Sequence, residues 1–533
     1  MKNIIRGVAS ALAVCSVSAL MAQEANEVEV LRRQVRELQQ QFEQVHQKQR
    51  AQIEALQQQV NTLRSAPKLA LPPPGTATGD RPSEALSAKV LGTPAPGGNP
   101  PPVPWKPSDP LRLGSGKSAI DIGLVGSLTV GSSTARDVAS GTQSGGHDPN
   151  QRGFTLQGLE MSLSGSVDPY FRGNANLVYA LDADGESAVE LEEAWLETMA
   201  LPGNLQVRAG QIYSDFGRHN PTHLHSWGFL DTPLVNGRLL GPDGLRNPGA
   251  RVSWLAPLPF FAELSLGVQN SSGGTAASFR SAGGHNHGGG GETLPLAYRH
   301  ADNDRGVRQL ADLLLSPRYA MSFDLTDSQT ILMGASGAFG PNSRGGSDGL
   351  ASATQIYGTD LTWKWKSPRH SGGFPFVTWQ NEAMLRRYQA GAFDWDAEGS
   401  TTGGLDPAVE IQDLGTGLAA VLPQETLTDY GGYSQLLYGF RKGWVAGMRF
   451  DYLGSRLADY ERMPLAFNGA TLERDPQRAP RWRLSPNLTW HPTEYSKLRL
   501  QYNYDDRFGL RLEDHSVWLQ FEFLLGAHAA HKF

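Results

Sequence analysis

The feature that most constrains the fold is the regular alternation of side chains from Ser516 to Phe533. Apolar residues occupy one face of an extended chain here, at Val517, Leu519, Phe521, Phe523 and Leu525, and the opposite face carries Trp518, Gln520 and Glu522. Successive side chains of a strand point to opposite faces, so the segment predicts a strand with one apolar and one mainly polar surface. Such a strand fits lipid on one side and water on the other. The alternative is an amphipathic edge strand of a soluble sheet.

The same two-faced pattern recurs from Leu111 onward. Between Lys497 and Tyr504, for example, apolar and aromatic residues alternate with charged and amide residues. About sixteen such segments can be counted, an even number as bacterial outer-membrane barrels require. The predicted fold class is therefore an all-β transmembrane barrel of about 16 antiparallel strands over residues 111–533, preceded by an N-terminal α-helical coiled coil.

The connections between these segments support a membrane barrel. Short turns are predicted near residues 167–169, 201–203, 258–259, 326–328, 441–443 and 492–494. They alternate with long polar loops at about 131–151, 213–248, 270–310, 340–353, 391–426 and 455–479. Short turns at one end and long loops at the other are typical of a transmembrane barrel with both termini on the periplasmic side. A soluble β-sandwich has no reason to keep this alternation.

The first 110 residues have a different composition. Residues 1–22 read as a signal peptide, with Lys2 and Arg6 before an apolar run that is too short to span a bilayer. Residues 24–64 carry apolar positions at steps of three and four and predict a periplasmic coiled coil; the alternative is an isolated amphipathic helix. Residues 65–110 form a Pro-rich linker. Cys15 is the single cysteine, so removal of the signal excludes disulfides and thiolate metal sites.

Composition agrees with a barrel that faces water inside and lipid outside. The mean hydropathy is −0.37, glycine accounts for 61 of 533 residues, and the formal net charge is only −6. Only alternate residues of such a barrel need be apolar, so a negative mean hydropathy is expected. The charge balance gives no case for binding nucleic acid.

A barrel of this size predicts a pore. About eight strands leave an interior filled by side chains, whereas about sixteen leave an aqueous lumen. The long loop at 213–248, taken as the third extracellular loop, is predicted to fold inward, narrow the lumen and set its charge, and the alternative is an ordinary outward loop. The candidate residues for constriction and selectivity are Arg208, just before this loop, and Asp215, Arg218, His219, His223, His225, Asp231 and Arg238 within it.

Two groups of histidines are candidate metal ligands. His219, His223 and His225 lie within seven residues, and His285 and His287 lie in the glycine-rich stretch 283–288. Imidazole binds zinc, copper or nickel, and a nearby carboxylate such as Asp215 could complete a tetrahedral zinc site. The alternative is that these are exposed loop histidines that bind no metal. No cofactor other than zinc is suggested.

The barrel resembles general or substrate-selective porins, in particular the phosphate-selective porin O/P type. Arg208-Ala209-Gly210-Gln211 is similar to an Arg-x-Gly-Gln stretch of that family. The terminal Phe533 resembles the C-terminal signature read by the barrel assembly machinery, and the coiled coil resembles periplasmic extensions of some sugar porins. The resemblance implies a homotrimer in the bacterial outer membrane, held through the coiled coil and the barrel, with lipid around it and the N-terminal segment in the periplasm.

A second resemblance concerns metal. The stretches 191–196 and 215–218 and the ending 526–533 look like bacterial proteins known as zinc-regulated, TonB-dependent outer-membrane receptors. That resemblance implies a link to zinc. Receptors of this kind carry an N-terminal globular plug, and here a coiled coil and a linker occupy that position.

No enzymatic motif is recognised. The sequence has no Gly-x-Ser-x-Gly nucleophile elbow and no His-Glu-x-x-His. Glu192 and Glu193 are adjacent in a predicted strand and should therefore face opposite sides, which argues against a paired acid and base. The expected function is a porin that passes small hydrophilic solutes or ions passively. The alternatives are a metal-linked uptake channel or receptor and a structural outer-membrane tether.

Overall fold

The computed structural model describes residues 111–113, 120–166, 168–181, 185, 187–280, 296–299, 307–344, 352–394, 421–462, 465–467, 470–472 and 474–526. The predicted signal peptide (1–22), coiled coil (24–64) and linker (65–110) lie outside these residues. His285, His287 and the terminal Phe533 also lie outside them.

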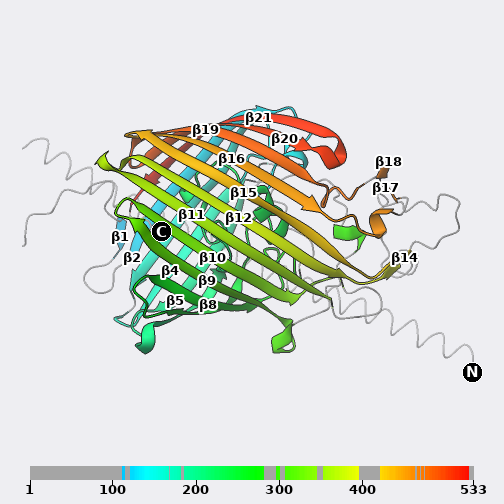
Figure 1. The fold of residues 1–533 in the computed structure, drawn as a ribbon, viewed down its shortest axis with the longest axis horizontal. Coiled ribbons are helices and arrows are strands. Elements are labelled where there is room, and N and C mark those ends of the chain that lie inside the picture. Colours follow the sequence, from blue (N-terminus) through cyan, green and yellow to red (C-terminus); the bar gives the residue numbers. More distant parts are fainter. Residues whose placement is uncertain are drawn as a thin grey trace, which may run out of the picture. The chain divides into compact units, whose positions relative to one another are not determined.

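The described chain forms a closed antiparallel barrel of 16 strands, which confirms the predicted strand number (Figure 1). Each strand pairs with the next along the chain, and the last pairs with the first, from Leu124 opposite Leu525 to Ser133 opposite Ser516. The barrel strands are β2 (Ile120–Ser133), β3 (Gly153–Ser166), β4 (Phe171–Leu181), β5 (Ser187–Thr198), β6 (Leu205–Tyr213), β7 (Arg246–Leu255), β8 (Phe261–Asn270), β9 (Leu313–Thr326), β10 (Gln329–Pro341), β11 (Ala353–Ser371), β12 (Phe374–Ala390), β15 (Glu425–Arg441), β16 (Trp444–Ser455), β19 (Arg481–Thr493), β20 (Ser496–Arg507) and β21 (Leu512–Leu525).

Smaller elements extend the wall and the loops. The short strand β1 (Leu111–Leu113) pairs with the start of β2. Two small hairpins, β13 (Phe393–Asp394) with β14 (Val421–Leu422) and β17 (Leu465–Phe467) with β18 (Ala470–Leu472), lie in long connections. The helices are α2 (Val138–Gly141), α3 (Leu234–Leu240) and the 3₁₀ turns η1 (Pro202–Asn204), η2 (Leu224–Ser226), η3 (Leu296–Tyr298), η4 (Leu310–Asp312), η5 (Tyr460–Arg462) and η6 (Phe508–Leu510). None of the helices in the described residues is long and apolar enough to cross a bilayer.

Burial in the wall is inverted relative to a soluble protein. On β21, Leu519 and Phe521 are 42% and 43% exposed, whereas Gln520 between them is fully buried. On β20, Leu500 is exposed and Arg499 is buried. Charged residues are almost never fully buried unless they are paired, so the interior must supply partners for them. The predicted alternation of apolar outward and polar inward residues is therefore confirmed.

The connections follow the predicted alternation. Long segments 134–152, 214–245, 271–312, 342–352, 391–424 and 456–480 join strands at one end, and short turns join them at the other. The structure adds a short turn at 372–373 and two short connections, 182–186 and 508–511, at the long-loop end. The third of the connections at that end, 214–245, joins β6 to β7 and is called L3 below.

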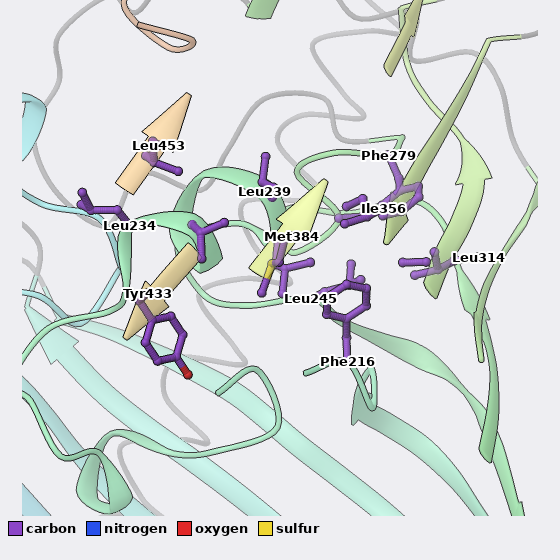
Figure 2. Close-up of a cluster of buried hydrophobic side chains, with 14 residues drawn as sticks. Phe216, Leu234, Leu239, Leu245, Phe279, Leu314, Ile356, Met384, Tyr433 and Leu453 are labelled. Atoms are coloured by element: carbon purple, nitrogen blue, oxygen red, sulfur yellow. The ribbon is translucent and has the colours of Figure 1, made fainter. Parts of the chain in front are cut away.

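L3 packs on the inner face of the wall through an apolar cluster (Figure 2). Leu234 and Leu239 of α3, with Phe216 and Leu245 of L3, meet wall residues that include Ile356 and Met384. The other members are Val235, Leu240, Ala276, Phe279, Leu314, Ala338, Tyr433 and Leu453. Burial of these side chains removes apolar surface from water and holds L3 in one place. This apolar cluster occupies part of the barrel interior, a feature that the alternation of strand residues does not predict.

Candidate functional site

A cavity of about 1380 Å³ lies inside the barrel. It extends from the short-turn end, where Asp168 and Arg172 line it, to L3. Seven of the eight residues proposed for constriction and selectivity line it, and they are Arg208, Asp215, Arg218, His219, His223, His225 and Asp231. Arg238 does not line it; its guanidinium donates to the backbone oxygen of Ala479 at 2.9 Å.

Asp231 fixes L3 to the far wall. Its carboxylate accepts from Arg449 at 2.7 Å and from Arg483 at 3.0 Å. Gln501 and Asn503 donate to the same carboxylate at 2.8 and 2.9 Å. Burial would raise the pKa of Asp231, but the two guanidinium groups lower it below its ordinary value. The carboxylate is therefore ionised, and it ties L3 to β16, β19 and β20 at once.

A second attachment joins the start of L3 to β12. One oxygen of Glu382 accepts from the backbone N–H groups of Arg218 and His219 at 2.9 and 2.6 Å. Gly217 precedes them with φ of 62°, a conformation that residues with a side chain rarely adopt. A Cβ at this position would lie 2.2 Å from the Glu382 carboxylate, so the close approach of backbone to carboxylate requires glycine.

Three carboxylates and two histidines gather where L3 meets β3 and β5. His223 Nδ1 lies 2.8 Å from Glu192 and His223 Nε2 lies 3.2 Å from Glu193. His225 Nδ1 lies 2.9 Å from Glu160, and the two imidazole rings are stacked with centroids 5.9 Å apart. Burial would lower the pKa of His223, but Glu160 and Glu192 raise it well above its ordinary value. The group is called the carboxylate–histidine cluster below.

The expectation that Glu192 and Glu193 face opposite sides is wrong. Both are buried in the interior, and both contact His223. The cause is a β-bulge in β5, since Asn176 pairs with Glu193 and Leu177 pairs with Leu191, which leaves Glu192 without a partner across the strand pair. A bulge inserts one residue and so breaks the alternation locally.

The proposed metal ligands are only partly brought together. His223 and His225 are neighbours, but His219 packs on Trp227 with ring centroids 4.6 Å apart. Burial and the nearby Arg449 lower the pKa of His219 to about 3, so its imidazole is neutral. Asp215 accepts from Ser265 at 3.0 Å and faces Arg251 at 3.4 Å. His285 and His287 lie outside the described residues.

Arg208 lies against the wall rather than beside L3. It donates to Glu197 at 2.7 Å and stacks over Trp195 at 3.9 Å from the ring centre. Sequence reasoning missed Glu160, Glu382, Arg449 and Arg483 as partners of L3. Their inward positions on alternating strands were the available signal, but alternation does not reveal which wall residue a loop will reach.

No family model matches the chain. An uncharacterized protein of Aquifex aeolicus is 29% identical over 403 residues, which span 73% of each chain. Among solved structures, the outer-membrane channel DcaP of Acinetobacter baumannii has a TM-score of 0.44 at 12% identity, with 76% of this chain and 97% of that chain covered. The anion-selective porin of Comamonas acidovorans has a TM-score of 0.43 at 7% identity, with 76% and 99% covered. Identities of 12% and 7% with TM-scores of 0.44 and 0.43 do not assign this chain to the family of either solved structure.

Proposed function

We propose that this protein is an outer-membrane porin that lets small hydrophilic solutes or ions diffuse passively through a lumen narrowed by L3. The observation that carries the proposal is the inverted burial of a closed barrel around a cavity of about 1380 Å³ that many charged side chains line. An exterior of exposed Leu, Phe and Tyr side chains would associate in water but suits lipid. Lipid also requires that every backbone group of the sheet be satisfied, as closure of β2 on β21 achieves.

The position of L3 supports a constriction. L3 leaves the wall at β6, and its attachments lie on β12 through Glu382 and on β16, β19 and β20 through Arg449, Arg483 and their neighbours. A loop tied to strands on several sides of a barrel crosses the lumen. Arg218, a half-buried charged residue of L3 that lines the cavity, would then contact permeating solutes.

The apolar cluster supports a narrow channel rather than a wide one. It joins α3 to residues of β9, β10, β11, β12, β15 and β16 and so fills interior volume beside L3. We therefore expect a smaller conductance than an unobstructed lumen of sixteen strands would give. In this proposal the short turns face the periplasm, where the coiled coil predicted for residues 24–64 joins copies of the chain.

The test is a recording of single-channel currents from the purified, folded protein in planar lipid bilayers. The expected result is stable openings in uniform steps, with a reversal potential under a salt gradient that reports charge preference. A barrel that is folded by circular dichroism and heat-modifiable migration, yet never conducts, would contradict the porin and favour a structural tether.

A further inference from the structure

We propose that Glu160, Glu192 and His223 form a site for one divalent transition-metal ion, with Zn²⁺ as the preferred ion, between L3 and the barrel wall. The three side chains come from β3, β5 and L3. Each offers one ligand atom, and these atoms lie within 4.8 Å of one another. They are called the metal triad below. The site is a property of the folded barrel and does not depend on conduction.

The distances within the metal triad suit a small tetrahedral ion. His223 Nδ1 lies 2.8 Å from an oxygen of Glu192 and 3.5 Å from an oxygen of Glu160. Zinc binds imidazole nitrogen and carboxylate oxygen at about 2.0–2.2 Å, so its tetrahedral ligands lie about 3.3 Å apart. The two distances from His223 lie on either side of that spacing, and the ligand atoms of Glu160 and Glu192 lie within 4.8 Å of each other.

The second nitrogen of His223 has the partner that zinc-bound histidines usually have. Nε2 lies 3.2 Å from Glu193, and a carboxylate at this position fixes the tautomer that leaves Nδ1 free to bind metal. The amide of Asn176 lies 3.0 Å from the same Nε2 and also donates to Glu160 at 3.1 Å. Metal binding therefore requires this amide to turn its oxygen toward Nε2, which releases Glu160 to the ion.

The charge of the cluster favours a bound cation. The side chains of Glu160, Glu192 and Glu193 are only 10%, 5% and 11% exposed. Buried carboxylates are costly unless a cationic group faces them. The imidazoles of His147, His223 and His225 each lie within 3.3 Å of Glu160 or Glu192. A divalent ion at this place would supply two positive charges to the three carboxylates. Copper and nickel also bind imidazole, but two carboxylates with one imidazole in tetrahedral spacing fit zinc better.

The ion can enter from the lumen, and its binding would fasten L3. Glu160 and His223 line the central cavity, and Glu192 lies behind them in the wall. His225 Nδ1, 2.9 Å from Glu160, is near enough to become a fourth ligand after a small movement. Because His223 belongs to L3 while both carboxylates belong to the wall, metal occupancy would hold this side of L3 as Asp231 holds the other.

The experiment measures Zn²⁺ binding to the purified, untagged barrel by isothermal titration calorimetry, with Co²⁺ absorption as a report of geometry. We expect one ion per chain at micromolar affinity and the intense visible bands of tetrahedral Co²⁺. His223→Ala and Glu192→Gln should abolish both signals. Glu193→Gln leaves the metal triad intact and should weaken binding by about 10- to 100-fold.

Matched controls separate this site from other histidines. His491 lines the same cavity outside the cluster, so His491→Ala should bind Zn²⁺ as the unaltered protein does. Absence of Zn²⁺ binding by the folded barrel, or binding that survives His223→Ala but is lost in His285→Ala/His287→Ala, would overturn the proposal. Heat-modifiable migration of each variant shows whether it is folded. A barrel that binds Zn²⁺ but never conducts contradicts only the porin function.

Discussion

At the scale of single residues, the decisive groups are buried charges that bind several partners at once. Asp231 is bonded by two arginines and two amides from three strands, although it is only 2% exposed. A buried ion pair is weak evidence for net stability, because desolvation offsets much of its attraction. Removal of the Asp231 charge nevertheless costs free energy, since Arg449 and Arg483 then keep only one carboxylate each, Asp451 and Asp505. Asp231 is therefore best understood as fixing the position of L3.

Replacement of this residue tests that role. Asp231→Asn should destabilise the barrel by about 1–3 kcal/mol, because Arg449 and Arg483 lose their shared counterion, although each keeps a second carboxylate, Asp451 or Asp505. Because L3 would lose its attachment to β16 and β19, the variant should also give larger and noisier single-channel currents. Urea unfolding followed by tryptophan fluorescence and bilayer recordings measure the two effects. Asp215→Asn is the control, since its arginine partner is farther away, at 3.4 Å, and it should change both quantities less. If both variants changed the free energy of unfolding and the currents equally, Asp231 would not be the residue that fixes L3.

At the scale of elements, L3 is a short folded unit rather than a flexible loop. Its helix α3 presents Leu234, Val235, Leu239 and Leu240 to the wall, each at most 1% exposed. A helix of seven residues has little stability of its own, so its conformation depends on this packing. In the wall, the β-bulge at Glu192 provides part of the contact surface for L3, because it turns the two adjacent carboxylates of Glu192 and Glu193 toward L3.

The packing of α3 can be tested with one substitution. Leu239→Ala should lower the free energy of unfolding by about 2–5 kcal/mol, because it leaves a cavity in the apolar cluster. Leu500→Ala, on the outward face of β20, is the control. Its side chain meets detergent or lipid, which fills the space that the deletion leaves. Denaturant unfolding in micelles gives both values, and a larger loss for Leu500→Ala would mean that the apolar cluster contributes little.

At the scale of the whole molecule, many charged side chains line the lumen, and their positive and negative charges are not equal in number. Among the residues that the structure describes, nine arginines and lysines line the cavity (Arg112, Arg172, Arg208, Arg218, Arg251, Lys364, Arg449, Lys497 and Arg499), against six acidic residues (Asp121, Glu160, Asp168, Glu193, Asp215 and Asp231). Several of the arginines bind wall carboxylates, which reduces the excess that a solute meets. The field in the lumen should still favour anions modestly.

The sign of the reversal potential checks this expectation. Under a tenfold KCl gradient we expect a weak anion preference that increases as the salt concentration is lowered, since screening then weakens. Lys364→Gln/Arg499→Gln should reduce the preference, because both residues line the cavity. Lys366→Gln is the control, because Lys366 carries the same charge but does not line the cavity. A cation preference in the unaltered protein would show that the acidic groups dominate the lumen.

The barrel could be predicted from the sequence because its signal is periodic and local. From Val517 to Phe523, the alternation of apolar and polar residues within one strand indicates which side chains point outward, and short polar segments mark the turns. The site could be predicted only in part. His223 was recognised within L3, but its partners Glu160 and Glu192 lie 63 and 31 residues away, as the chain numbering gives. The bulge that turns Glu192 inward has no local signature, because it depends on pairing with β4.

Closure of β2 on β21 also has a consequence for biogenesis. Ser133 and Ser516 are partners across this seam, so the barrel closes only when β2 meets β21, the last of the described wall strands. Until then the growing sheet has two unpaired edges, which are sites of aggregation. A nascent chain cut short before Leu512 would remain an open ribbon rather than a smaller pore. Translation errors and proteolysis near the carboxyl end should thus yield degradation products, not leaky channels.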